Sequence, residues 1–252
     1  MNKDNTKKRR RRTGLGPLQK FITVLLAALV VSFATMVFFK VDSFVVTGNS
    51  QYTDEEIIEA SGVAVGDNLI LVNKGQTANL IRGQLNYITD IKLLRVLPGT
   101  LEISVIESGA AAYVTDAVGS NWYIDKNGKV LSKADQPSGI AVVGFTPEGA
   151  TAGYDLTAVE GDETKLNQLT TLLAALERIG IAANVSVIDL STDYNPKLTY
   201  DERFIVELGA IDDIDYKLEY LIAVRELLTD SQAGTIDLTL DADSMAHFRP
   251  NA

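Results

Sequence analysis

The apolar and polar residues of this chain form one long apolar run near its beginning and, after it, shorter segments with helical or alternating spacing. Residues 21–39 contain no charge, proline or glycine, and Lys20 and Lys40 flank them. A helix of this length spans about 28 Å, close to the hydrocarbon thickness of a bilayer, and satisfies its own backbone polar groups there. The pattern predicts a transmembrane helix over residues 21–39, preceded by a basic cytoplasmic segment over residues 1–20.

Two other interpretations of the apolar run are open. A basic start followed by an apolar run is also typical of a cleaved signal peptide, and Ser32-Phe33-Ala34 offers a weak cleavage site. The run continues to Phe39, beyond the usual length of a signal core, which favours an anchor. A buried helix of a soluble protein is the third interpretation, and the flanking lysines and the lack of a polar face argue against it.

Residues 41–108 have the pattern of a small domain in which two helices pack on a three-stranded sheet. Thr53 and Glu56 form a capping box at the start of the first helix, since each side chain can pair with the backbone amide of the other residue. Pro98 and Gly99 join the last two strands and suit a type II turn, in which glycine takes the positive φ. The expected strand, helix, helix, strand and strand cover residues 41–47, 54–60, 76–87, 91–97 and 100–107.

Residues 109–250 alternate between strand-like and helix-like segments, which predicts a mixed α/β domain. Residues 121–131 form two apolar strands joined at residues 125–128, the pattern of a hairpin. A glycine-rich linker or long loop is expected over residues 146–160. Leucines at helical spacing mark the next helix, which Gly180 ends. The expected helices cover residues 162–179 and 213–229, and the expected strands cover residues 185–190, 198–200, 204–209 and 234–240, followed by a closing segment at 244–248.

The order and spacing of these motifs resemble the FtsQ/DivIB family of bacterial cell-division proteins, which carry one POTRA domain directly outside a single anchor. The residues that carry the resemblance are 44–49, 53–57, 67–69, 95–107 and 121–131. The chain departs from the family pattern where Ser108 follows Glu107, in place of Arg-x-Pro, and where Leu97 replaces a tryptophan.

The resemblance implies an α+β fold. It comprises one transmembrane helix, a POTRA domain (β-α-α-β-β) over residues 41–108, and a mixed α/β unit, the β domain, over residues 109–250 that ends in an edge strand.

The distribution of charge gives the expected orientation in the membrane. Residues 1–20 carry eight basic residues and one acid, whereas the chain from Lys40 onward carries 15 basic and 32 acidic residues, a formal charge of −17. Basic flanks stay in the cytoplasm, so residues 41–252 are expected outside. The acidic outer part argues against nucleic acid or anionic lipid as its ligand. With no cysteine, it has no disulfide framework.

The sequence contains no catalytic set, cofactor motif or metal motif that is more specific than chance occurrence of the same residues would give. One histidine and no cysteine exclude thiol nucleophiles and paired-histidine metal sites. Two aspartate clusters lack the spacing of a calcium loop: Asp212, Asp213 and Asp215, and Asp237, Asp241 and Asp243. We therefore expect a protein that is not an enzyme and needs no cofactor. Paired carboxylates could still hydrolyse a glycosidic bond, so a membrane-anchored cell-wall hydrolase is the alternative function.

The remaining candidate chemistry is protein binding along the last predicted strand. An edge strand presents unpaired backbone groups that another chain can complete, and Met245, Ala246, His247 and Phe248 are the candidate residues. The alternative is that Phe248 fills the core of the β domain.

The family resemblance implies what this strand would bind and where. It implies a divisome scaffold at the division septum that binds coiled-coil partners of the FtsB/DivIC and FtsL type, and septal peptidoglycan synthases. A POTRA protein of outer-membrane transport is a further alternative, but it would need many barrel strands that this sequence lacks.

Overall fold

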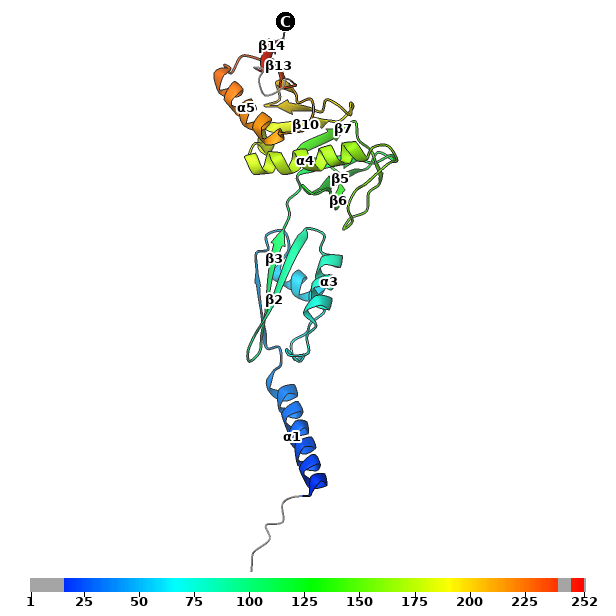
Figure 1. The fold of residues 1–252 in the computed structure, drawn as a ribbon, viewed down its shortest axis with the longest axis vertical. Helices are drawn as coiled ribbons and strands as arrows, with labels where there is room; N and C mark the ends of the chain where they lie inside the picture. The colour runs from blue at the N-terminus through cyan, green and yellow to red at the C-terminus, as the bar shows by residue number, and fades with distance from the viewer. Residues whose placement is uncertain (1–15, 240–245, 252) are drawn as a thin grey trace, which may run out of the picture.

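A computed structural model describes residues 16–239 and 246–251 as three parts that follow one another end to end (Figure 1). Helix α1 (Pro17–Phe38) forms the first part, with proline at its first position after Gly16. It is long and apolar enough to cross a membrane over Pro17–Thr35, and none of that span is buried inside the protein. The helix includes most of the predicted run at 21–39 and begins four residues earlier.

The second part is a three-stranded sheet with two helices on one face. Strand β3 lies in the centre, parallel to β1 and antiparallel to β2. The capping box predicted at Thr53 and Glu56 is present, and Gly62 ends the first helix in the left-handed conformation. The expected order of strand, helix, helix, strand and strand is therefore confirmed. The elements are β1 (Ser43–Thr47), α2 (Asp54–Ser61), α3 (Lys74–Gln84), β2 (Ile88–Val96) and β3 (Thr100–Glu107).

Two details of the sequence prediction for this part are wrong. The second helix ends at Gln84 rather than at 87, because Leu85 is extended, and Ile88 begins β2 as a buried residue. The β2–β3 connection is not a type II turn: the Leu97–Pro98 peptide is cis, and Gly99 lacks a positive φ. Gly99 is instead required by a close approach, since a Cβ there would lie 2.8 Å from the carbonyl oxygen of Lys40.

The third part is built on a nine-stranded sheet in the order β14-β13-β12-β11-β10-β7-β4-β5-β6. Helices α4 (Glu163–Ile179) and α5 (Ile214–Leu227) pack together and share a core with the buried side chains of the strands. The sheet strands are β4 (Ala112–Thr115), β5 (Asn121–Ile124), β6 (Val130–Ala134), β7 (Ile140–Val143), β10 (Val185–Asp189), β11 (Lys197–Tyr200), β12 (Phe204–Glu207), β13 (Gly234–Asp237) and β14 (His247–Pro250).

The predicted linker at 146–160 contains a two-stranded ribbon, β8 (Pro147–Gly149) with β9 (Thr157–Ala158), and it packs Leu156 into the core. The predicted leucine helix is confirmed as α4, and Gly180 ends it with φ 82°. A short 3₁₀ helix, η1 (Ala182–Asn184), then leads into β10. The fold is therefore α+β, with an apolar helix before a three-stranded sheet covered by two helices and a larger β-rich part.

Polar contacts join the two sheets directly. The hydroxyl groups of Tyr87 and Ser132 lie 2.8 Å apart, and Lys129 donates its ammonium group to the carbonyl oxygen of Ile88 at 3.3 Å. Burial lowers the pKa of Lys129, although the nearby Asp125 and Asp155 oppose this shift. Two hydrogen bonds thus join the second and third parts in addition to the chain that links them.

Candidate partner-binding site

Strand β14 lies at one end of the nine-stranded sheet, and it pairs with β13 alone within the described residues. The ladder is antiparallel, from Gly234 opposite Pro250 to Asp237 opposite His247. The amide of Asn251 donates to the carbonyl of Ala233 at 3.0 Å. Because the bonded and non-bonded pairs of an antiparallel ladder alternate, the backbone N–H and C=O of Phe248 point away from β13. These groups form an edge to which another strand can add.

The side chain of Phe248 faces the core of the β domain. It is half-buried, and its ring meets the ring of Phe204 edge-on, with centroids 6.1 Å apart and an interplanar angle of 71°. Phe204 is fully buried. Ala246 packs against the same core, and its amide lies 3.5 Å from the hydroxyl of Tyr220. One side of β14 is therefore fixed by aromatic packing.

The opposite face of the same strands carries a row of charged residues. Lys197 and Glu207 form an ion pair at 2.9 Å on neighbouring strands. Arg249 of β14 reaches across the sheet to Glu207 at 3.1 Å and to Asp237 at 2.6 Å. His247 is exposed and lies opposite Asp237 in the ladder. A strand added to β14 would therefore lie beside a face of paired basic and acidic side chains.

Electrostatics at this face favour the ionised carboxylate of Asp237. Burial acts to raise the pKa of Asp237. The hydroxyl and amide of Thr239 donate to its carboxylate at 2.6 and 3.0 Å, and the charges of Arg249 and His247 add to their effect. The net result is a pKa below the usual carboxyl value, so Asp237 remains a charged partner for Arg249 at neutral pH.

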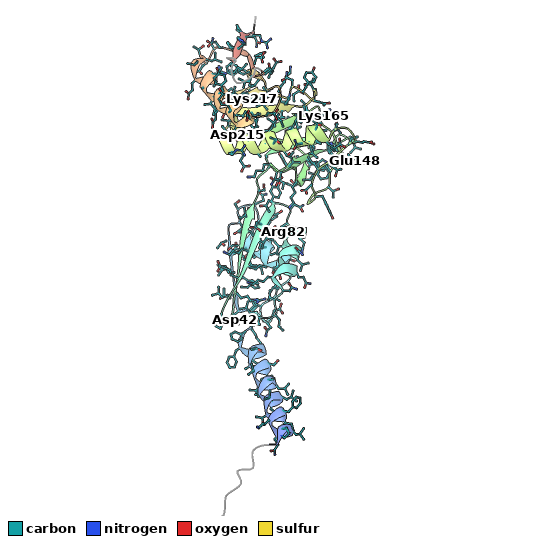
Figure 2. The ribbon with its side chains drawn as sticks, in the orientation of Figure 1. Asp42, Arg82, Glu148, Lys165, Asp215 and Lys217 are labelled. Atoms are coloured by element: carbon teal, nitrogen blue, oxygen red, sulfur yellow. The ribbon has the colours of Figure 1, made fainter. Side chains whose placement is uncertain are left out.

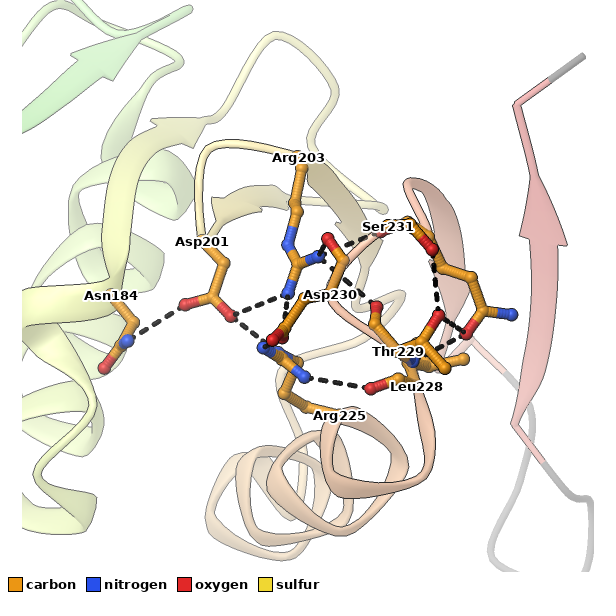
Figure 3. A network of polar contacts seen from close by, with 9 residues as sticks. Asn184, Asp201, Arg203, Arg225, Leu228, Thr229, Asp230 and Ser231 are labelled. Carbon is orange, nitrogen blue, oxygen red and sulfur yellow. Dashed lines mark hydrogen bonds and ion pairs between the residues drawn. The ribbon is translucent and has the colours of Figure 1, made fainter.

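A second polar network holds the segment that leads into β13 (Figure 3). Asp201 accepts a hydrogen bond from Arg225 at 2.7 Å and another from Asn184 at 2.9 Å. Arg203 donates to the backbone carbonyls of Thr229, Asp230 and Gln232. The guanidinium of Arg203 also lies 4.8 Å from the centre of the Phe204 ring. The network thus links the end of α5 to the aromatic pair beneath β14.

The turn between β11 and β12 supplies the key carboxylate of this network. Asp201 and Glu202 both have positive φ, and the amide of Arg203 donates to the carbonyl of Tyr200 at 3.2 Å. This is the geometry of a type I′ hairpin turn, in which aspartate is tolerated without glycine. Neither Asp201 nor Glu202 was predicted as a functional residue from the sequence. The sequence feature that indicates this turn is an aspartate between two short apolar segments.

Three of the four predicted site residues lie among the described residues. Ala246 and Phe248 face the core side of the sheet, and His247 is exposed on the other side. Met245 lies outside the described residues. In residues 16–239 and 246–251, no group of three or more His, Asp or Glu residues is arranged to hold a metal ion.

The architecture defines a class of protein: an apolar helix, a POTRA-type domain and a mixed α/β domain follow one another in one chain. Residues 39–108 match the family model of the FtsQ-type POTRA domain. Residues 112–239 match the model of the C-terminal part of the cell division protein FtsQ/DivIB. The chain belongs to the FtsQ/DivIB family of cell-division proteins.

Cell-division proteins of other bacteria are similar in sequence to this chain, two of them over most of its length. The cell division protein DivIB of Clostridium botulinum is 26% identical over 231 residues, which covers 89% of this chain and 88% of the relative. DivIB of Clostridium acetobutylicum is 26% identical over 208 residues, 80% of each chain. FtsQ of Corynebacterium glutamicum is 28% identical over 128 residues, 51% of this chain and 57% of that protein. Strand β14 lies beyond the matched range of either family model.

Proposed function

We propose that this protein is a single-pass scaffold of the bacterial divisome that binds other division proteins and catalyses no reaction. Helix α1 would anchor it in the cell membrane, with the amino terminus in the cytoplasm and the POTRA and β domains outside. The apolar span at Pro17–Thr35 and the contrast between the basic first 20 residues and the acidic remainder support this orientation. The domains proposed are residues 1–20, 21–39, 41–108 and 109–250.

The observation that carries the proposed binding role is the edge of β14. Its outer backbone groups have no strand beside them among the described residues, while Phe248 holds the strand in place from the core side. A strand at a sheet edge is a common docking surface, because main-chain hydrogen bonds give affinity and alternate side chains give specificity. The proposed partners are coiled-coil division proteins of the FtsB/DivIC and FtsL type, and septal peptidoglycan synthases at the division site.

The test is a titration of the full chain in detergent with the extracellular part of the organism's FtsB/DivIC-type protein. Phe248→Ala removes the aromatic support of β14. The matched control is Phe44→Ala, which truncates a half-buried phenylalanine of the POTRA domain. We expect Phe248→Ala to weaken binding about 30-fold, because β14 loses the ring that holds it against the core, and Phe44→Ala to leave binding unchanged.

Thermal unfolding of both variants separates binding from folding. Equal losses of affinity in the two variants, matched by equal losses of stability, would argue against β14 as the binding edge. Wild-type protein that folds but does not bind would contradict the scaffold role itself. Its turnover of purified peptidoglycan would then be measured, because the cell-wall hydrolase is the remaining function.

A further inference from the structure

The end of the POTRA domain nearest α1 is joined to that helix by hydrogen bonds. The side-chain amide of Asn68 donates to the carbonyl oxygen of Thr35 at 3.1 Å, and the amide of Leu69 donates to that of Phe39 at 2.8 Å. The carbonyl of Thr35 also accepts the amide of Phe39 at 3.3 Å, whereas the carbonyl of Phe39, at the end of the helix, is one of those that have no partner within it. The loop over residues 63–71 therefore caps α1, which fixes the position of this loop relative to the anchor.

The capping contact also sets the level of the loop along the helix. Thr35 lies within the apolar span, one turn before the helix ends at Phe38. The apolar sequence continues to Phe39, and Lys40 follows as the first charged residue. A loop that reaches the carbonyl of Thr35 lies at the height where the apolar part of α1 ends, and that height is the boundary between hydrocarbon and headgroups.

Apolar side chains project from this loop into solvent. Leu71 is 74% exposed and Val65 is 69% exposed, and Ile70 is also exposed, whereas Leu69 between them is fully buried. Single exposed apolar residues are normal on a protein surface, but several on one short loop mark an interaction site. Loop 63–71 therefore has one anchoring leucine inside and three apolar side chains outside.

The β2–β3 turn contributes to the same end of the domain. The carbonyl of Gly99 accepts the amide of Asp42 at 2.7 Å, while the carbonyl of Asp67 accepts the amide of Val41 at the same distance. The turn and the loop therefore flank the short connector that leaves α1. Leu97, in this turn, is exposed. Figure 2 places Asp42 at the end of the domain that adjoins α1.

We infer that this apolar surface, formed by Val65, Ile70, Leu71 and Leu97, rests in the interfacial layer of the bilayer that holds α1. The inference rests on the proposed membrane anchoring. The occupant is lipid, because the hydrogen bonds to Thr35 and Phe39 keep the surface at the membrane boundary whatever else is present. Lys40, which is exposed and pairs with Asn68 of the loop, can extend its ammonium group toward phosphate headgroups.

The contact is apolar and does not depend on the charge of the lipid. The outer part of the chain is strongly acidic, and an acidic surface gains nothing from anionic headgroups. Bilayers of zwitterionic phosphatidylcholine are therefore sufficient to detect the contact between this surface and lipid. The POTRA domain would lie against the membrane in one orientation rather than swing on a flexible tether.

The absence of cysteine makes a direct test possible, because one introduced cysteine gives one label. The full chain carries a nitroxide label at Leu71→Cys and is placed as single copies in phosphatidylcholine nanodiscs. Collisions with oxygen, which concentrates in lipid, are compared with collisions with a water-soluble nickel chelate. Val31→Cys in α1 is the lipid reference, and Leu227→Cys, at a position 85% exposed in α5, is the water reference.

We expect the ratio of oxygen to nickel collisions at residue 71 to exceed that at residue 227 severalfold and to approach that at residue 31. A label at residue 71 that matches residue 227, while residue 31 is in lipid, would overturn the lipid contact and leave the anchor standing. A water-exposed label at residue 31 would overturn both. Protection at residue 71 that appears only after division proteins are added would assign the surface to a protein instead.

Discussion

The ring of Phe248 on β14 meets the ring of Phe204 on β12 edge-on, with centroids 6.1 Å apart. The contact spans β13, which lies between these strands. Phe204 is fully buried, and the guanidinium of Arg203 lies over its ring. The edge strand is therefore held by its ladder with β13 and by two contacts that reach past that ladder, this ring pair on the core side and the ion pair of Arg249 with Glu207 on the other face.

A double-mutant cycle measures this aromatic contact. We expect Phe204→Leu and Phe248→Leu to be coupled by about 1 kcal/mol, because an edge-to-face pair contributes this much beyond area burial. The measurement is the free energy of unfolding in denaturant for the wild type, both single variants and the double variant. A coupling near zero would show that Phe248 is held by general apolar burial rather than by the ring pair.

The carboxylate of Asp201 predicts a dependence of stability on pH. Burial acts to raise the pKa of Asp201, but hydrogen bonds from Arg225 and Asn184 and the charge of Arg203 bring it below the usual value. A carboxylate whose pKa is lower in the folded than in the unfolded state stabilises the fold, and this contribution is fully present at neutral pH. This contribution declines as the pH falls through the ordinary carboxyl range and is lost below the folded-state pKa.

The variant Asp201→Asn should show this directly. We expect it to lose on the order of 2 kcal/mol of unfolding free energy at neutral pH, as for hydrogen bonds to a charged group, and to show a flatter decline in acid. Asp230→Asn is the control, because the Asp230 side chain contacts the same arginines but is 97% exposed, where ion pairs contribute little. Parallel acid profiles for Asp201→Asn and the wild type would contradict the prediction.

The carboxylate of Glu107, at the end of β3, holds the loop between β1 and α2. Glu107 accepts hydrogen bonds from the amides of Ser50 and Gln51, each at 2.7 Å, and from the amide of Tyr52 at 3.2 Å. Burial acts to raise its pKa, and these bonds lower it below the usual value. Glu107 therefore closes the loop between β1 and α2.

The substitution Glu107→Gln should loosen this loop. We expect faster hydrogen exchange at the amides of residues 50–52 and a loss of about 2 kcal/mol of unfolding free energy, because an amide replaces the charged acceptor. Glu102→Gln, on the same strand, should change neither quantity. Unchanged exchange at residues 50–52 would mean that the loop is held by other contacts.

The hydrogen bond from Asn68 to Thr35 predicts a rigid connection between anchor and domain. Nitroxide labels at Val31→Cys and Glu59→Cys should give a narrow distance distribution in nanodiscs. Asn68→Ala should broaden it, because one fixed contact between loop and helix is lost. Asn79→Ala, at an exposed position of α3, is the control and should leave the distribution narrow.

Local signals in the sequence were sufficient for the helices and for the POTRA order of elements. The capping box at Thr53 and the glycine stop at Gly180 act within one turn, so their effect can be derived without the rest of the fold. The end of α3 could not be derived in this way. Ile88 continues the helical stripe of apolar residues, and only its pairing with Glu107 across the sheet draws it into β2.

The features around the candidate site depend on contacts between residues far apart in the chain. Strands β4 and β7 are only four residues each and pair in parallel in the middle of the large sheet, so no hairpin turn connects this pair, although β4 forms an antiparallel hairpin with β5. Asp201 becomes important because α5 brings Arg225 to it from 24 residues away. The position of the last strand at a sheet edge was expected from the family resemblance, whereas its aromatic contact with Phe204 follows only from the topology.

The end-to-end arrangement of the three parts places β14 far from α1 along the molecule. Figure 1 shows α1 at one tip of the molecule and β14 near the other, with the POTRA domain between them. Under the proposal that α1 lies in the bilayer and β14 binds a coiled-coil partner, a helical stalk of that partner rooted in the same bilayer must rise past the POTRA domain to reach β14, and it gains about 1.5 Å for each residue. The proposed binding at β14 therefore requires a partner whose stalk is at least as long as the distance from the membrane to this strand.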